Sequence, residues 1–294
     1  MSRAARVTAQ GKINLLLRVL ARESSGYHSI ETVFLRLDLG DEIRVCIAPG
    51  RSLDCAGPAM PTGGLAPTEQ NLAYRAAVAY HEATGWPTGF AIEIEKHIPV
   101  GGGLGGGSAD AGAVLRALDA LAPNPLGPGL VELATTLGAD VPFMAIDSPM
   151  ALAWGRGERL HPLHALDSRP VLLTIPDFSV PTPDAYAWLA ADRGSYAPLA
   201  RVLAPESLAT WESLVMVAEN DFEPVVARRH PVIAELVDEL DAAGAIVAMM
   251  SGSGSTVFGV FSALPVADRR PSRDGVRMVE TRTSERVVRV ELDG

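Results

Sequence analysis

A run of glycines about a third of the way along the chain constrains its fold most strongly. Six of the seven residues from Gly101 to Gly107 are glycine, and only Leu104 interrupts them. Each glycine costs conformational entropy on folding, so no ordinary turn requires so many. The run therefore predicts a backbone that a ligand approaches closely. A flexible linker is the alternative, but a linker is not normally joined to a strand on one side and an amphipathic helix on the other.

The segments that flank the glycines indicate which kind of ligand this is. Phe90 to Ile94 alternates like a strand, and Ser108 to Leu121 carries apolar residues at helical spacing. In the order strand, glycine loop and helix, consecutive backbone N–H groups point into one concavity. The free N–H groups and the dipole of the helix add to them. The sequence therefore predicts a phosphate-binding loop.

Two common phosphate-binding motifs do not fit this loop. Gly101, Gly103 and Gly106 satisfy the dinucleotide pattern G-x-G-x-x-G, but the following helix runs into prolines instead of a second strand that ends in an acidic residue. A P-loop needs Gly-Lys-Ser/Thr, and no lysine stands between Gly107 and Ser108. A different class of phosphate-binding fold is required.

Composition excludes several other functions. The net charge of −10 argues against a nucleic-acid partner, because binding to a phosphate backbone needs a basic surface. Cys46 and Cys55 have no second Cys or His at metal-ligand spacing, so we expect neither a disulfide framework nor a zinc site. No apolar run approaches the roughly 18 residues of a membrane span, and we expect a cytoplasmic protein.

The rest of the chain alternates between predicted strands and helices, which indicates an α+β or α/β architecture. Predicted strands are 6–19, 32–39, 42–48, 150–153, 171–175, 246–250, 256–261 and 287–292, and further predicted helices are 71–84, 130–137, 184–191 and 230–243. The stretch 49–67, rich in Gly and Pro, is predicted to be a loop. The segment from Val266 onward matches no motif, and we assign it no role.

Three segments in order along the chain resemble the GHMP kinases, a family named for galactokinase, homoserine kinase, mevalonate kinase and phosphomevalonate kinase. They are Gly11 to Leu15, Pro99 to Ala109 and Ser251 to Thr256. Further segments resemble a narrower branch of that family, whose substrate is a cytidine diphosphate-linked methylerythritol. These are Gly26-Tyr27-His28 with Glu31 to Phe34, the loop from Pro99 to Ser108, Gly138 to Phe143, and Gly155-Arg156-Gly157-Glu158.

The resemblance implies an α+β fold of two domains. Residues 1–160 would form an N-terminal ATP-binding α/β domain that is ribosomal-protein-S5-domain-2-like, and residues 161–294 a C-terminal ferredoxin-like α+β domain. The chain departs from the residues usual in the family at Gly11, Ala109 and Pro181, which usually are Ala, Ser and Ser.

The resemblance also assigns Lys12 and Asp140 as the catalytic pair. A kinase must place an alcohol in line with the γ-phosphoryl group, neutralise charge on its oxygens and accept the alcohol proton. Asp140 follows Gly138 and precedes Val141-Pro142, so we expect its carboxylate on a turn, as the proton acceptor. Lys12 is a charge within an otherwise apolar strand pattern; outside the family context, a side chain that snorkels to solvent would explain it.

Ligand-binding residues follow from the same resemblance. ATP would be bound by the loop residues Pro99, Val100, Gly101, Gly102, Gly103, Leu104, Gly105, Gly106, Gly107, Ser108 and Ala109. The substrate would be bound by Asn14, Tyr27, His28, Lys96 and Tyr186. Mg²⁺ is implied by ATP, and Ser108 is a candidate ligand, although no dedicated acidic ligand is evident. The turn from Ser251 to Thr256 is expected to line the substrate and phosphate region, although an ordinary hairpin-like connection explains its sequence nearly as well.

The function predicted is transfer of phosphate from ATP to the 2-hydroxyl of the cytidine compound, in the non-mevalonate route to isoprenoids. We expect small-molecule partners only, with no nucleic acid and no membrane, in a monomer or a homodimer. Two alternatives stay open: a GHMP kinase of the homoserine or mevalonate type, and a nucleotide sensor without turnover. The GYH segment and the segment 138–143 weigh against the first, and the presence of both Lys12 and Asp140 weighs against the second.

Overall fold

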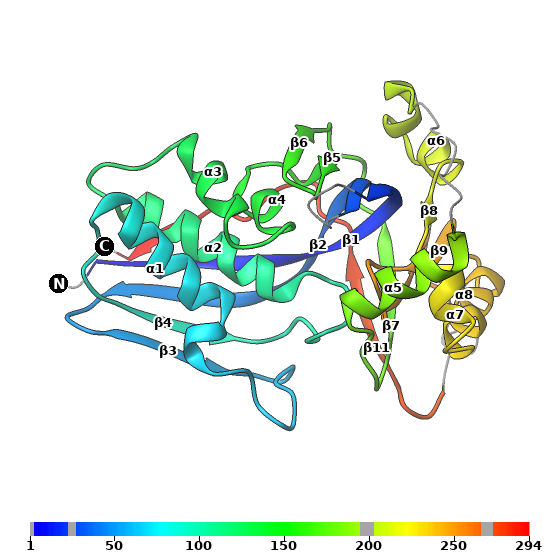
Figure 1. The fold of residues 1–294 in the computed structure, drawn as a ribbon, viewed down its shortest axis with the longest axis horizontal. Helices are drawn as coiled ribbons and strands as arrows, with labels where there is room; N and C mark the ends of the chain where they lie inside the picture. Colours follow the sequence, from blue (N-terminus) through cyan, green and yellow to red (C-terminus); the bar gives the residue numbers. More distant parts are fainter. Residues whose placement is uncertain (1–2, 23–27, 195–202, 266–272, 294) are drawn as a thin grey trace.

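In the computed structural model, which describes residues 3–22, 28–194, 203–265 and 273–293, two long neighbouring strands carry the larger of two sheets (Figure 1). β1 (Ala4–Arg22) and β2 (His28–Ile47) run antiparallel, with Ala4 opposite Cys46 and Arg22 opposite His28. The sequence predicted two strands where β2 is continuous. Gly40 stays in the ladder opposite Gln10, because its missing Cβ leaves room for Thr8.

The larger sheet is completed by shorter strands from several parts of the chain. They are β3 (Arg51–Ala56), β4 (Phe90–Glu95), β5 (Met150–Gly155), β6 (Arg159–Pro162), β8 (Glu219–Asn220) and β12 (Glu291–Asp293). The main path is β12-β1-β2-β4-β3; β5 pairs with β2 and β6, and β8 pairs with β1. β3 lies within the stretch predicted to be a loop, so that prediction was wrong. β3 is a sheet edge with mostly exposed side chains, which leaves little apolar periodicity to detect.

Helices cover one face of this sheet (Figure 1). They are α1 (Leu72–Thr84), α2 (Gly106–Leu121), α3 (Gly129–Thr135) and α4 (Val141–Ala145), with the short 3₁₀ helix η1 (Thr68–Gln70) before α1. The predictions of α1, α2 and α3 are confirmed, although α2 begins two residues earlier, inside the glycine run. α2 is largely buried and packs against β1, α1 and α4.

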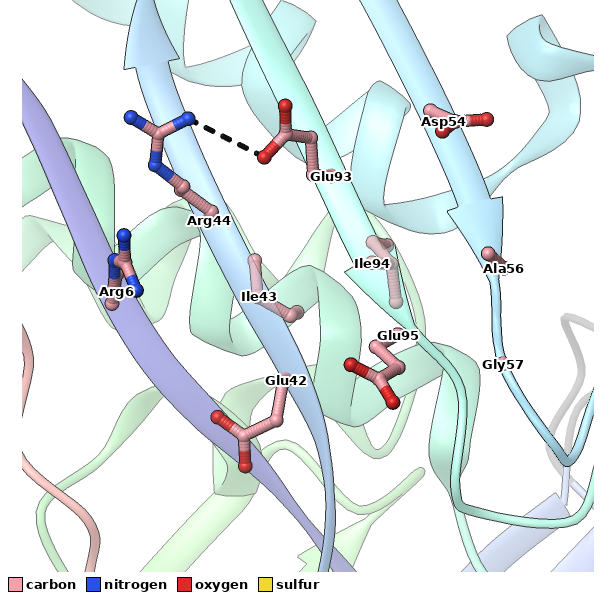
Figure 2. A pocket seen from close by; sticks show the side chains of 10 residues that line it. All are labelled: Arg6, Glu42, Ile43, Arg44, Asp54, Ala56, Gly57, Glu93, Ile94 and Glu95. Carbon is pink, nitrogen blue, oxygen red and sulfur yellow. Dashed lines mark hydrogen bonds and ion pairs between the residues drawn. The ribbon is translucent and has the colours of Figure 1, made fainter.

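The opposite face of the sheet carries a hollow of about 710 Å³ between charged side chains, which Figure 2 shows. Arg44 pairs with Glu93 there at 3.4 Å, while Glu42 on β2, Glu95 on β4 and Asp54 on β3 also line the hollow. Carboxylates outnumber guanidinium groups in this lining. The hollow is therefore poorly suited to a phosphate-bearing ligand.

The smaller sheet has the order β11-β7-β10-β9 and is antiparallel throughout. Its strands are β7 (Pro170–Pro176), β9 (Val247–Met250), β10 (Val257–Val260) and β11 (Val276–Arg282). α5 (Thr182–Arg193), α7 (Glu223–Ala227) and α8 (Val232–Ala242) pack with it around a second core, and η2 (Pro205–Leu208) and α6 (Trp211–Val215) lie between α5 and β8 in the chain.

The C-terminal part of the chain differs from the prediction in two respects. β11 was not predicted, and the predicted strand 287–292 is reduced to β12. β11 was missed because all of its side chains are partly or fully exposed, which leaves no clear apolar pattern to detect. The division at residue 160 stays a prediction: β8 and β12 both pair with β1, so the chain returns to the larger sheet after the smaller one. None of the described helices has the length and apolarity needed to cross a membrane.

Close packing of α2 on α4 supplies a test of this fold. A Cβ added at Gly112 would lie 2.5 Å from the Cβ of Met144 and 2.7 Å from its carbonyl carbon. Gly112→Ala should lower the free energy of unfolding by about 1–3 kcal/mol, because neither backbone can move away without repacking the core. Gly129→Ala is the matched control, since the nearest atom to its added Cβ is 3.9 Å away. Urea unfolding should show the control unchanged or up to about 1 kcal/mol more stable; equal effects of the two changes would contradict the packing described.

Candidate active site

The glycine loop leads from β4 to α2 and adopts a conformation that side chains would prevent. Gly101, Gly103 and Gly105 have φ values of 80°, 81° and 71°, in the left-handed region. A Cβ at Gly103 would also lie 2.1 Å from the carbonyl oxygen of Ser251. Gly105 precedes the first turn of α2, so the loop ends at a helix N-terminus. The loop therefore presents backbone N–H groups and a positive dipole end to one region.

The turn between β9 and β10 docks onto this loop. Ser251 Oγ donates to the carbonyl of Gly103 at 3.0 Å, and the backbone N–H of Thr256 donates to the carbonyl of Gly102 at 3.2 Å. Gly252, Ser253 and Gly254 then line a cavity beside the loop. Both sheets thus contribute residues to the lining of this cavity.

Two cavities share the glycine loop as a common wall. The first, which we call the loop cavity, has a volume of about 290 Å³ and extends from the loop toward Leu65 and Asn71. The second, the lysine cavity, has a volume of about 500 Å³ and lies against Lys12 and Asp140. Their shared residues are Gly101, Gly103, Gly105 and Ser108. Two ligands can therefore lie on either side of the same short stretch of backbone.

Lys12 joins the glycine loop to Asp140. Its side chain is buried, and Nζ lies 2.6 Å from Asn14 Oδ1 and 3.0 Å from the carbonyl oxygen of Gly103. The same Nζ forms an ion pair with Asp140 Oδ2 at 3.4 Å. Lys12 therefore does not snorkel to solvent; its charge is held inside by three oxygen atoms from three segments.

Asp140 directly precedes α4 and faces the lysine cavity. Its carboxylate does not cap the helix, although it stands at the N-cap position, and it is turned toward Lys12 instead. The side chain keeps 30% of its exposure, which makes it accessible to a ligand in the cavity. The structure thus brings the two residues predicted to be catalytic together.

Other predicted ligand-binding residues fall into three groups. Asn14 and Tyr186 line the lysine cavity with Asp140. Tyr186 packs edge-on against Phe222, and burial, followed by the negative charge of Asp140, raises the pKa of Tyr186 to about 12. Tyr27 lies outside the described residues, and for His28 the structure places only the backbone, at the start of β2.

Lys96 is in a different place from the other predicted substrate residues. Its ammonium is buried between the carboxylates of Asp41 and Asp110, with Nζ 2.6 Å from Asp110 Oδ2. It lines the loop cavity and not the lysine cavity. Asp41 also accepts from the backbone N–H groups of His97 and Ile98, so this cluster anchors the chain just before the glycine loop.

Within the loop itself, Pro99 to Ser108 line the loop cavity but Ala109 does not. The Ala109 methyl is buried in the core. The departure at Gly11 is also mild, because a Cβ there would lie 3.4 Å from the nearest atoms, in ordinary contact.

The sequence did not single out several residues that the structure places at the site. Arg156, Ser179 and Thr182 line the lysine cavity, and Asp110 lines the loop cavity. Arg156 belongs to a segment that carried the resemblance, but its charge gave no indication of where it points. Asp110 is a charged residue among buried apolar positions of α2, which is a signal that could have been used.

Asp110 gives the folded protein a pH dependence. Burial, opposed by Lys96 and reinforced by Asp41, raises the pKa of Asp110 to about 7, and its Oδ1 atom has no hydrogen-bond partner among the described residues. Its pKa in the unfolded chain is about 3.9. The folded protein thus binds this proton more tightly than the unfolded chain does. The protonation of Asp110 therefore stabilises the fold fully below about pH 4, and this stabilisation is lost as the pH rises through about 7.

Asp110→Asn should therefore flatten the decline in unfolding free energy between about pH 4 and pH 8, measured by urea unfolding. Asp54→Asn removes an exposed carboxyl from the same domain and serves as the control. Its unfolding free energy should change with pH as that of the wild type does. If Asp110→Asn left the pH dependence of the unfolding free energy unchanged, another group would have to cause that dependence.

Comparison with known proteins agrees with this geometry. Residues 71–148 match the GHMP kinases N terminal domain, and residues 202–274 match the GHMP kinases C terminal domain. The chain is therefore a GHMP kinase, and the predicted two-domain fold is confirmed. A crystal structure of homoserine kinase from Cytophaga hutchinsonii has the same fold, with a TM-score of 0.65 at 16% identity over 99% of this chain and 97% of that one.

More similar proteins define the branch. A protein from Desulfotalea psychrophila, named 4-diphosphocytidyl-2-C-methyl-D-erythritol kinase, is 40% identical over 86% of this chain and 84% of its own length. One of the same name from Pelotomaculum thermopropionicum is 39% identical over 94% of this chain and 96% of its own. A crystal structure of 4-(cytidine 5'-diphospho)-2C-methyl-D-erythritol kinase superposes with a TM-score of 0.74 at 36% identity, covering 95% of this chain and 98% of that one. The chain belongs to the family of 4-diphosphocytidyl-2-C-methyl-D-erythritol kinases.

Proposed function

We propose that this protein transfers the γ-phosphoryl group of ATP to the 2-hydroxyl of 4-diphosphocytidyl-2-C-methyl-D-erythritol. The products are the 2-phosphate and ADP, in the non-mevalonate route to isoprenoid precursors. The observation that carries the proposal is the shared wall between the two cavities, with Lys12 and Asp140 beside it. A nucleotide in the loop cavity and an alcohol in the lysine cavity would meet at Gly103, Gly105 and Ser108. Family membership supports this substrate over homoserine or mevalonate.

The glycine loop is the proposed site for the ATP phosphates. Its N–H groups and the N-terminus of α2 would neutralise phosphate oxygens without any side chain. Mg²⁺ would enter with ATP, and Ser108, which lines both cavities, is the residue we propose to contact it. No group of three or more acidic, His or Cys residues suited to a metal occurs in the described ranges. This fits an ion held mainly by phosphates and water, as Mg²⁺ usually is.

Lys12 and Asp140 are the residues we propose for the chemical step. The alcohol oxygen forms a bond to the γ-phosphorus as the bond from that phosphorus to ADP breaks, and the alcohol proton passes to Asp140. A carboxylate is a weak base for an alcohol, so we place the proton transfer late, when the new O–P bond is largely formed. Lys12 lies between Gly103 and Asp140, where its charge would stabilise the oxygens of the transferred group.

The remainder of the lysine cavity is the proposed site of the cytidine diphosphate portion. Tyr186 offers an aromatic ring for the base, a contact worth about 1–3 kcal/mol when the two stack. Arg156 supplies positive charge on the same lining and suits the diphosphate. His28 and Tyr27 remain predicted contacts of the base.

An ADP-release assay tests the substrate. MgATP is supplied with 4-diphosphocytidyl-2-C-methyl-D-erythritol, homoserine, mevalonate or no alcohol. We expect turnover with the cytidine compound alone, because only this ligand can use both Tyr186 and Arg156. Turnover with another alcohol would keep the kinase and reject the substrate. No turnover with any alcohol, while ATP still binds, would favour a nucleotide sensor.

Asp140→Asn tests the catalytic assignment. The change keeps the shape of the side chain and removes its capacity to accept a proton, so kcat should fall by about 10²–10⁴-fold. The dissociation constant of ATP, measured by calorimetry, should change less than about threefold. Asp184→Asn, an exposed carboxyl in the first turn of α5, is the control and should retain wild-type kcat. Loss of ATP binding in Asp140→Asn would instead show a structural role.

A further inference from the structure

We propose that Arg36 is a positioning residue that holds Asp140 at its distance from Lys12. The inference deepens the proposed function and rests on it, because it takes Asp140 to be the proton acceptor. Arg36 touches neither cavity. It acts on Asp140 through α4, the helix that begins at the residue after Asp140.

The guanidinium of Arg36 binds the far end of this short helix. Nη2 donates to the carbonyl oxygens of Phe143 and Ile146 at 2.7 and 3.1 Å, and Nε donates to that of Ser148 at 3.1 Å. Carbonyls at the end of a helix have no partners within it. α4 is too short to be held by its own hydrogen bonds alone. One side chain therefore fixes the end of α4 and the chain that follows it.

The start of α4 packs on α2 and α3, but its backbone hydrogen bonds are long. The backbone N–H of Met144 donates to the carbonyl of Asp140 at 3.3 Å, which is a long hydrogen bond. On its outer side, Gly157 packs closely on Ala139, where an added Cβ would lie 3.0 Å from the Ala139 carbonyl oxygen. A shift of the helix end would therefore be transmitted to the Asp140 carboxylate within five residues.

Arg36 is also joined directly to the segment that carries Lys12. Lys12 on β1 lies opposite Arg36 on β2, and Asn14 lies opposite Phe34. Cross-strand partners in an antiparallel pair project from the same face, so these four side chains share one face. The strand pair thus carries Lys12 and the anchor of α4 at adjacent positions.

Two aromatic rings complete the connection. Lys12 Nζ lies 5.6 Å from the centre of the Phe34 ring, and Phe34 stacks on Phe143 of α4 with ring centres 5.0 Å apart. Arg36 Cζ lies 4.8 Å from the centre of the Phe143 ring on α4. The two cations are therefore separated by a stacked pair of rings, one from β2 and one from α4.

The chemistry of Arg36 is costly for a residue that only fills space. It is 1% exposed, and in the described part of the chain its hydrogen-bond partners are backbone carbonyls and the sulfur of Met144. Burial, with the nearby charge of Arg116, lowers the pKa of Arg36 to about 9, which still leaves it charged at neutral pH. An apolar side chain of similar volume would avoid the cost of burying this charge. An apolar residue could not supply the planar set of N–H donors with which the guanidinium binds these carbonyls.

The test compares Arg36→Met and Arg36→Lys with the wild type. Arg36→Met removes the donors but keeps most of the volume; Arg36→Lys keeps the charge and replaces the planar set of donors by a single ammonium. We expect kcat to fall about 10–100-fold in Arg36→Met and by a smaller factor in Arg36→Lys, because a displacement of about 1 Å at a reacting group costs up to about 100-fold. The KM values for ATP and the alcohol should change less than about threefold.

A double-mutant cycle separates positioning from general damage. If Arg36 acts through Asp140, adding Arg36→Met to Asp140→Asn should lower kcat no further, since the group being positioned is already lost. Arg18→Met is the matched control. The guanidinium of Arg18 is also buried, but it forms ion pairs with Glu31 on β2 and Glu219 on β8, so the variant should lose stability but keep kcat. Where Arg36→Met does not fold, the same cycle is run with Arg36→Lys.

The outcomes distinguish this inference from the proposed function. Wild-type kcat in folded Arg36→Lys and Arg36→Met would overturn the positioning role and leave the catalytic role of Asp140 intact. The positioning role would also be overturned if Arg36→Met lowered kcat by the same factor in the wild-type and the Asp140→Asn backgrounds. Retention of kcat in Asp140→Asn alone would reject the proposed catalytic pair instead. A loss of kcat that disappears in the Asp140→Asn background is the result we expect.

Discussion

The buried ammonium of Lys12 is the interaction on which the site depends. A buried charge must be paired and hydrogen-bonded, and Lys12 meets this requirement with Asn14, the carbonyl of Gly103 and Asp140. These partners come from β1, the glycine loop and the start of α4. Removing any of them would leave the charge less well compensated, so the ammonium holds the three segments at short mutual distances. It also brings a cation to the wall that the two cavities share.

The rest of the architecture supports that junction from both sides. On the larger sheet, Asp41 and Lys96 anchor the entry to the glycine loop, while Arg36 binds the end of α4. From the smaller sheet, the turn between β9 and β10 hydrogen-bonds to the loop. The exposed hollow on the opposite face of the larger sheet is larger than either cavity at the glycine loop, yet both of its guanidinium groups are paired with carboxylates (Figure 2). Chemistry, and not volume, identifies the site.

Patterns of neighbouring residues in the sequence predicted much of the fold. Contacts between residues far apart in the sequence could not be predicted from such patterns. The glycine run, α1 and α2 are visible because glycines and apolar periodicity act over a few residues. β3 and β11 were missed because their side chains are largely exposed. Lys96 was assigned to the substrate from the family resemblance. Its ion pairs reach Asp41, 55 residues away, and Asp110, so pairing across the fold decides where its charge points. Likewise, the residues near Arg36 in the sequence do not indicate that its side chain binds carbonyl groups more than 100 residues away.

The central claim is that two ligands meet across the glycine loop beside Lys12 and Asp140. A crystal structure with a non-hydrolysable ATP analogue and the cytidine substrate tests it most directly. The account predicts that the γ-phosphate lies within hydrogen-bonding distance of the loop N–H groups and Lys12 Nζ, with the 2-hydroxyl oxygen within hydrogen-bonding distance of Asp140. A γ-phosphate that points away from Lys12, or a hydroxyl out of reach of Asp140 in a closed ternary complex, would contradict it.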